Sequence, residues 1–286
     1  MNARNRTDVK RLVVPAPAKV NLFLHVTGRR ADGYHTLESL IALVDLADTI
    51  TLDRRDDGVI RREGDVAGVP EDVDLALRAA RALQAATGSC YGVEITLAKR
   101  IPLGSGLGGG SSDAASVLLA LNRLWALCLP RAELLRLALS LGADVPLFVA
   151  GENAVARGIG EVLTPVSLPQ CFVTLAFPGA AVPTADIFQA PELTRSTASA
   201  KIDVFSEGYG RNDLAPVTAA RFPAVASAIK ALSRASPQAR MTGSGACVFA
   251  AFPTEHEALS ALALLPKDMR GCVARTLARH PLAAFA

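Results

Sequence analysis

Hydrophobic and polar positions alternate along several short stretches in the first hundred residues. Lys19 to Val26 reads Lys-Val-Asn-Leu-Phe-Leu-His-Val, and this period of two predicts a half-buried strand with Lys19 and Asn21 on one face. Similar patterns predict strands at 37–44, 49–53 and 93–98. Apolar residues three and four positions apart predict a helix over 75–86, which a Thr-Gly pair ends. The first part of the chain is therefore expected to mix strands and helices.

The second part of the chain continues this mixture after a helix from about 111 to 127 and another over 132–141. The pattern restarts around Pro165–Pro169, which predicts a boundary between two domains, 12–166 and 167–286, after a polar tail at 1–11. The segment 195–211 shows no informative pattern. The later elements expected are a strand at 172–177, a helix at 224–232, a strand at 247–252, a helix at 255–265 and a strand at 272–277. The fold class predicted is α+β.

Composition narrows the class of protein. Half of the 286 residues are hydrophobic and 20% are charged, which suffices for a sizeable core. A formal net charge of +3 and few aromatic residues argue against a nucleic-acid partner. The longest apolar stretch, 117–129, is short and interrupted by polar residues, so no membrane partner is expected. The five cysteines form no CxxC pair, which predicts free thiols and a cytoplasmic location.

A glycine-rich turn between the strand at 93–98 and the next helix is the main candidate for chemistry. Glycines let backbone N–H groups approach an anion without a Cβ in the way, and a helix N-terminus follows directly. The turn is therefore predicted to bind the phosphates of a nucleotide, with Ser111 and Ser112 able to cap the helix, bond a phosphate or ligate Mg²⁺. Its residues are Pro102, Leu103, Gly104, Ser105, Gly106, Leu107, Gly108, Gly109, Gly110, Ser111 and Ser112.

The glycine-rich turn can also be compared with other nucleotide-binding motifs. A Walker loop needs a lysine after its last glycine, and Ser111 follows Gly110 instead. The spacing Gly104, Gly106, Gly109 matches a dinucleotide fingerprint, but a further helix follows where a second strand is required. That alternative would make the protein a dinucleotide-dependent oxidoreductase. The protein-kinase segments are absent from the sequence, and a flexible loop is a poor explanation for glycines this dense.

The turn resembles the phosphate loop of the GHMP kinases, whose pattern is a proline followed by Gly-Leu-Gly and Ser-Ser. Two more segments fit this family: Pro15–Leu22 resembles its first motif and Met241–Cys247 its glycine-containing third motif. The resemblance implies two domains, an N-terminal domain like ribosomal protein S5 domain 2 and a C-terminal ferredoxin-like domain, with the active site in the cleft between them. It implies ATP and Mg²⁺ as cofactors, with Ser112 as the candidate metal ligand.

The resemblance also implies the reaction, which is transfer of the ATP γ-phosphoryl group to an alcohol. Asp144, in the segment Leu141–Pro146, is the residue it assigns as the acceptor of the alcohol proton, and Lys19 is the second catalytic candidate. From the residues alone, Asp144 could equally be a turn or cap aspartate and Lys19 an exposed strand lysine.

The segment Gly33-Tyr34-His35 narrows the resemblance to family members that act on a CDP-linked polyol in non-mevalonate isoprenoid synthesis. By that resemblance Asn21, Tyr34, His35, Thr184 and Phe188 bind the substrate, with His35 on the cytosine. From the residues alone, Phe188 could equally pack in a core and His35 could lie in a surface turn. The expected partners are this small molecule alone, with no nucleic acid and no membrane, and the expected assembly is a monomer or weak homodimer. Homoserine and mevalonate kinases of the same family are the closest alternatives.

Overall fold

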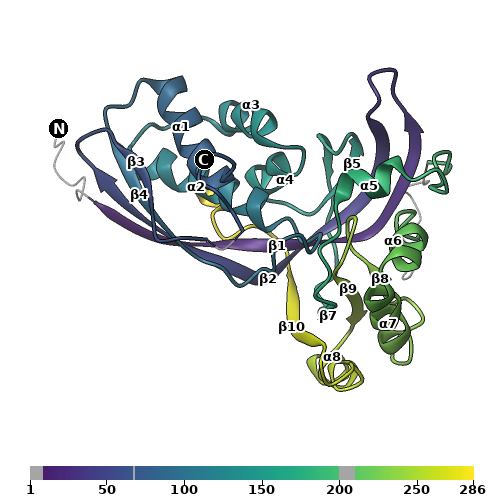
Figure 1. Ribbon diagram of the computed structural model, residues 1–286. Helices are drawn as coiled ribbons and strands as arrows, with labels where there is room; N and C mark the ends of the chain where they lie inside the picture. Colours follow the sequence, from purple (N-terminus) through teal and green to yellow (C-terminus); the bar gives the residue numbers. More distant parts are fainter. Residues whose placement is uncertain (1–8, 67, 200–209) are drawn as a thin grey trace.

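The computed structural model describes residues 9–66, 68–199 and 210–286, and a long antiparallel hairpin runs through it (Figure 1). Its strands are β1 (Arg11–Arg29) and β2 (His35–Arg55), each much longer than the sequence pattern predicts. The two strands predicted within β2 are one, because β1 pairs with β2 on both sides of a register shift at Pro17 and Ala18. Bulges of this kind bend a strand without ending it.

One sheet of ten strands is assembled around β2. Seven of them follow the order β3-β4-β2-β10-β7-β9-β8, and off this path β1 and β5 pair with β2 and β6 pairs with β5. β4 pairs with one end of β2 and β5 with the other, while β10 joins its middle through only two residue pairs, Thr276 with Val44 and Leu277 with Leu43. The strand bounds are β3 Ile60–Glu63, β4 Gly92–Ala98, β5 Ala154–Gly158, β6 Val162–Pro165, β7 Phe172–Phe177, β8 Arg240–Met241, β9 Val248–Phe252 and β10 Arg270–Leu277.

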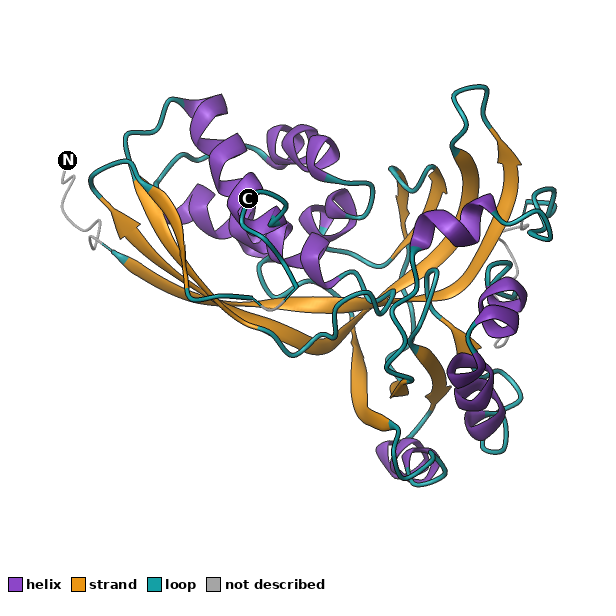
Figure 2. Ribbon diagram, in the orientation of Figure 1, coloured by secondary structure: helices purple, strands orange, loops and turns teal. Residues whose placement is uncertain are grey.

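The helices form two groups (Figure 2). Helices α1 to α4 lie together over one half of the long hairpin, and α6 to α8 lie with the strands of the other half. The bounds are α1 Leu75–Thr87, α2 Gly109–Leu124, α3 Arg131–Leu141, α4 Val145–Ala150, α5 Thr184–Gln189, α6 Ala215–Arg221, α7 Pro223–Leu232 and α8 Glu255–Leu262, with a 3₁₀ turn at Ala283–Phe285. The α+β class is confirmed.

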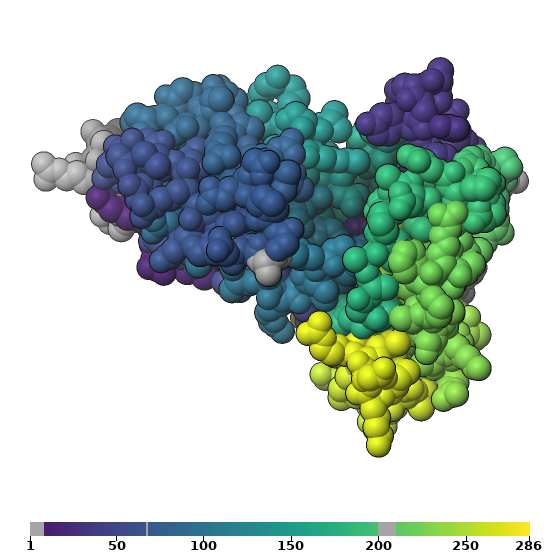
Figure 3. Space-filling model, viewed as in Figure 1, coloured from purple at the N-terminus to yellow at the C-terminus, as the bar shows by residue number. Residues whose placement is uncertain are grey.

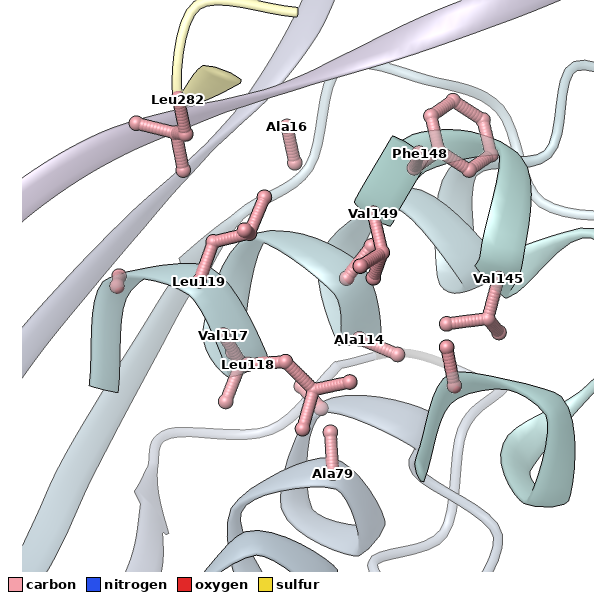
Figure 4. Packing of buried hydrophobic residues seen from close by; sticks show 14 of the residues in the cluster. Ala16, Ala79, Ala114, Val117, Leu118, Leu119, Val145, Phe148, Val149 and Leu282 are labelled. Carbon is pink, nitrogen blue, oxygen red and sulfur yellow. The ribbon is translucent and has the colours of Figure 1, made fainter. Parts of the chain in front are cut away.

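Helix α2 is the centre of the first hydrophobic core (Figure 4). Ala114, Val117, Leu118 and Leu119 are fully buried, and side chains from α1, α4 and β1 surround them. A helix that is apolar on most of its faces is stable only when other elements cover those faces. The glycine-rich turn thus leads into a helix that is buried along most of its length.

The second core does not follow the order of the chain. Leu24 and Val26 of β1 pack with α6 and α7, whereas Leu282, near the C-terminus, packs in the first core. The predicted division at 166 and 167 stays a prediction, and chain segments cross between the two cores in both directions. Each core therefore contains residues that are far apart in the sequence.

Most of the elements predicted from periodicity exist within a few residues of their predicted bounds. The sequence pattern did not predict seven short elements, because two to seven residues hold too little periodic pattern. They are the strands β3, β5, β6 and β8 and the helices α4, α5 and α6. In the part of the chain that the structure describes, no helix is both long and apolar enough to cross a membrane.

Candidate functional site

A cavity of about 360 Å³ lies where the two groups of elements meet, in the hollow between the blue and green parts of Figure 3. Residues from β1, the glycine-rich turn, the segment just before α4, and α5 all reach it. Of the residues predicted from the sequence, its lining includes Lys19, Asn21, Gly104, Gly106, Gly108, Ser111, Asp144, Thr184 and Phe188. Catalytic, phosphate-binding and substrate-binding candidates that are far apart in the sequence therefore share one space.

Lys19 is held between the strand and the glycine-rich turn. Its backbone N–H donates to the carbonyl of Leu107 at 3.0 Å, which ties β1 to the turn. Its Nζ donates to Asn21 Oδ1 at 2.7 Å and lies 3.7 Å from Asp144 Oδ2. The side chain is only 5% exposed, so the exposed-lysine alternative is wrong. The shared face of Lys19 and Asn21, predicted from the strand period, is present.

Asp144 stands just before α4 with a free carboxylate. It occupies the N-cap position, yet its side chain makes no capping hydrogen bond, so the interpretation as a cap residue is wrong. The side chain is 43% exposed and faces the cavity. A carboxylate that is partly open, beside an ammonium group, can meet a substrate and accept a proton from it.

Asn21 is fixed in orientation by two residues that the sequence analysis did not single out. Its Nδ2 donates to Ser39 Oγ at 2.8 Å, and Ser39 Oγ donates in turn to the carbonyl of Phe23 at 2.5 Å. Its backbone N–H donates to Thr242 Oγ1 at 2.9 Å, and Thr242 Oγ1 donates to Asn21 Oδ1 at 3.1 Å. The amide oxygen is thereby aimed at Lys19. Thr242 lies inside the recognised third motif, which was the available signal.

The glycine-rich turn packs directly against the turn at 242–245. Gly106 has φ +78°, and a Cβ on it would lie 2.4 Å from the carbonyl oxygen of Thr242. The backbone N–H of Cys247 donates to the carbonyl of Ser105 at 3.0 Å. Leu107 is fully buried and points into a core, so it anchors the turn and leaves its glycines to line the cavity. Glycine at position 106 thus permits the close approach of the two turns, and the approach of backbone N–H groups to an anion stays a prediction.

The two serines at the start of α2 face opposite ways. Ser111 lines the cavity, whereas Ser112 is fully buried and its hydroxyl donates to the carbonyl of Pro17 at 2.6 Å. The choice of Ser112 as metal ligand therefore has to be corrected, because its hydroxyl is engaged on the core side of the helix. Ser111 is the serine that meets the cavity. The sequence could not choose between neighbours that lie about 100° apart around a helix.

A second lysine, Lys99, lies behind the turn between two carboxylates. Its Nζ is 2.5 Å from both Asp48 Oδ2 and Asp113 Oδ2, and Asp48 Oδ1 accepts the backbone N–H groups of Arg100 and Ile101. Burial, opposed by Lys99 and reinforced by Asp48, raises the pKa of Asp113 to about 7. The two carboxylates outweigh burial at Lys99 and raise its pKa. These contacts fix the strand end and the first turn of α2 to each other.

The far end of the cavity holds the residues predicted to bind the base. Thr184 Oγ1 and Ser244 Oγ are 2.7 Å apart, and Phe188 lines the cavity beside them. The ring of His35 stacks on Phe188 with 5.2 Å between centroids and 30° between planes. Tyr34 is 63% exposed and does not line the cavity. Three of the five predicted substrate residues, Asn21, Thr184 and Phe188, therefore line the cavity, and His35 is linked to it through its stacking on Phe188.

The chemistry of the donors suits a cation that arrives with a ligand. Among the described residues no group of three or more histidine, cysteine, aspartate or glutamate side chains is placed to hold a metal ion. The cavity offers the Asp144 carboxylate and the Ser111 hydroxyl, which are oxygen donors of the kind Mg²⁺ prefers. The dinucleotide alternative is wrong, because α2 leads into α3 and not into a parallel strand.

Comparisons with known proteins agree with this arrangement. Residues 74–152 match the GHMP kinases N terminal domain, and residues 196–270 match the GHMP kinases C terminal domain. The chain is 57% identical over 277 residues to a 4-diphosphocytidyl-2-C-methyl-D-erythritol kinase of Cupriavidus necator, covering 95% of each chain. It is 58% identical to the protein of the same name from Thiobacillus denitrificans, covering 95% of this chain and 97% of the relative.

Two solved structures show the same fold. A crystal structure of a 4-(cytidine 5'-diphospho)-2C-methyl-D-erythritol kinase matches with a TM-score of 0.82 at 36% identity, covering 93% of this chain and 99% of the other. A homoserine kinase from Cytophaga hutchinsonii matches with a TM-score of 0.75 at 18% identity, covering 98% of both chains. At that identity the second likeness speaks for the fold alone, which is the two-domain GHMP kinase fold expected from the motifs.

Proposed function

The chain belongs to the 4-diphosphocytidyl-2-C-methyl-D-erythritol kinases of the GHMP kinase family, and we propose that it transfers the γ-phosphoryl group of ATP to the 2-hydroxyl of that CDP-linked polyol. This step belongs to non-mevalonate isoprenoid synthesis. The observation that supports it most is the Lys19–Asp144 pair, 3.7 Å apart, in the same cavity as the glycine-rich turn and the N-terminus of α2.

Different residues of this cavity have different roles in the proposed phosphoryl transfer. Asp144 accepts the proton of the attacking hydroxyl, because its carboxylate is open to the cavity and unused as a cap. The Lys19 ammonium, held by Asn21, lies where it stabilises negative charge on the reacting oxygens. Ser111 and Asp144, which line the cavity, would hold the Mg²⁺ that binds with ATP, and the ion would neutralise phosphate charge. The backbone of the glycine-rich turn and the start of α2 hold the phosphates.

The cytidine end of the substrate is proposed to lie at Thr184, Phe188 and His35. Phe188 presents an aromatic face that can stack on a base, and the imidazole of His35 beside it offers a hydrogen-bonding group. The exposed Tyr34 would cover the outer face of the base. The turn at 243–245 lines the space between this end and Lys19, where its backbone N–H groups suit the diphosphate.

The setting of the enzyme is part of the proposal. All five cysteines are free, which suits a reducing cytoplasm. The proposed assembly is a monomer or weak homodimer.

A panel of alcohols tests the proposed function. Purified protein is incubated with ATP, Mg²⁺ and one alcohol at a time: the CDP-linked methylerythritol, homoserine, mevalonate and galactose. We expect ADP release coupled to phosphorylation of the CDP-linked substrate alone. Turnover of homoserine or mevalonate without turnover of the CDP-linked alcohol would overturn the proposed acceptor and leave the phosphotransferase chemistry standing.

A further inference from the structure

Arg195 lies in the segment that carries no periodic pattern, and its guanidinium makes four hydrogen bonds to the base-binding end of the cavity. Its Nε donates to His35 Nε2 at 3.1 Å. The remaining bonds go to backbone carbonyls of Leu193, Phe188 and Ala190, at distances of 3.1, 3.1 and 2.6 Å. One side chain therefore joins the residue predicted to bond the base to the backbone of the residue predicted to stack on it.

This contact decides which nitrogen of His35 carries a proton. An arginine guanidinium has only donors and keeps its proton in proteins, so the nitrogen that faces it must accept. Nε2 of His35 is thus unprotonated, and a neutral ring then carries its proton on Nδ1. Within the described residues Nδ1 has no hydrogen-bond partner, so its N–H remains available to a ligand.

We propose that Arg195 is a specificity-determining positioning residue, which locks His35 as an Nδ1–H donor and so selects cytosine over uracil. The inference rests on the proposed function, since it concerns the base of the same substrate. Both bases carry an acceptor at O2, and they differ at N3, which is an acceptor in cytosine and an N–H donor in uracil. A donor locked against N3 matches cytosine and opposes uracil. A histidine free to exchange tautomers could match either base.

The charges around His35 keep its ring neutral, as the inference requires. Burial, with the positive charges of Arg195 and Arg29, lowers the pKa of His35 below its usual value. Arg195 faces the ring from the segment after α5, and Arg29 faces it from β1; Phe188 supplies an apolar face. A doubly protonated ring would place a second donor against Arg195, which this arrangement disfavours.

NMR of the free protein tests the tautomer without any substrate. Long-range ¹H–¹⁵N correlation spectra distinguish protonated from unprotonated ring nitrogens, and with four histidines in the chain the His35 signals are assigned by their loss in His35→Ala. At pH 7.5 we expect Nδ1 protonated and Nε2 unprotonated, and a mixture of tautomers in Arg195→Met. A proton on Nε2 in the wild-type protein would overturn the inference, whether or not the variant folds.

Kinetics test the selectivity. The ratio of kcat/KM for the CDP-linked polyol to that for its UDP analogue is measured in one preparation, so it does not depend on the folded fraction. In Arg195→Met we expect this ratio to fall about tenfold or more, the size expected for one lost donor–acceptor match, through KM more than kcat. Arg221→Met is the matched control, because Arg221 also bonds an α5 carbonyl, that of Asp186, but not His35. It should keep the wild-type ratio.

A double-mutant cycle separates action through His35 from a general structural role. In a His35→Ala background, Arg195→Met should leave the cytosine-to-uracil ratio nearly unchanged. An equal fall with and without His35 would overturn the inference, as would a wild-type ratio in Arg195→Met alone. Failure of the proposed function looks different: wild-type protein would then phosphorylate neither the CDP-linked nor the UDP-linked polyol.

Discussion

Two lysine–aspartate sites flank the glycine-rich turn, and they differ in how far their carboxylates are exposed. In the cavity, Lys19 and Asp144 stay 3.7 Å apart and the Asp144 side chain is 43% exposed. Behind the turn, Lys99 contacts Asp48 and Asp113 at 2.5 Å, and both carboxylates are at most 5% exposed. The first pair can change partners when a substrate enters. The second is buried away from the cavity and joins three elements to one another, although Asp113 Oδ1 has no hydrogen-bond partner among the described residues.

The hydrogen bonds and the exposure of a carboxylate distinguish a structural charge from a reactive one in this fold. A buried charge is costly unless it is hydrogen-bonded, and Asp48 accepts three hydrogen bonds, from Lys99 Nζ and from the backbone N–H groups of Arg100 and Ile101. A carboxylate left without local partners beside a buried ammonium group, as Asp144 is, indicates a site that a ligand completes. The contrast predicts loss of turnover on one side of the turn and loss of stability on the other.

Asp144→Asn should have the largest effect. Removing the proton acceptor is expected to lower kcat about 10²–10⁴-fold, while ATP binding and the melting temperature change little. Steady-state kinetics and equilibrium binding of an ATP analogue measure the two parts. Asp56→Asn, at an exposed pair with Lys10, is the matched control and should be fully active. Normal turnover in Asp144→Asn would refute its role as the base.

Asp48→Ala should act on stability. The substitution removes one of the two carboxylates that contact Lys99 and leaves two backbone N–H groups without their acceptor. The free energy of unfolding measured in urea should therefore fall by about 3–5 kcal/mol. Asp53→Ala, which breaks only the surface pair with Arg11, should cost about 0–1 kcal/mol. Comparable losses in the two variants would end the distinction between a buried site and a surface pair.

Gly106→Ala tests the turn that separates the two sites. Gly104 and Gly106 both have positive φ, and alanine costs about 1–2 kcal/mol at either position. Only at Gly106 would the new Cβ also meet a carbonyl oxygen, that of Thr242 at 2.4 Å; at Gly104 nothing lies within 4 Å. We expect Gly106→Ala to raise the KM for ATP and lower the melting temperature more than Gly104→Ala does. Equal effects would mean that the packing of the two turns contributes nothing.

Asp113→Asn should have an effect on stability whose size changes with pH. The folded-state pKa of Asp113 is raised by burial from 3.8 to about 7, so between these values the folded chain binds more protons than the unfolded chain. Wild-type stability should therefore fall by about 1–3 kcal/mol between pH 4 and 7, relative to a chain without this group. Thermal melting from pH 4 to 8 should show Asp113→Asn gaining on the wild type as pH rises. A constant difference would contradict the raised pKa.

Features that depend on residues close together in the chain could be predicted from the sequence. Five glycines before a helix predict an anion site from backbone chemistry alone, and a period of two placed Lys19 and Asn21 on one face. Both predictions concern spacings of a few residues, where local geometry is decisive. Asp144 came from the resemblance to the family, since one aspartate in a turn has many possible roles.

Tertiary structure alone decided the contacts between distant segments. Thr242 meets Asn21 across 221 residues, and Arg195 meets His35 across 160, so no local pattern could announce either contact. It also decided that Ser111 and not Ser112 faces the cavity, because burial depends on what packs against α2. The local sequence predicted the phosphate-binding turn, and long-range packing determined which of its neighbours are open to a ligand and which are sealed.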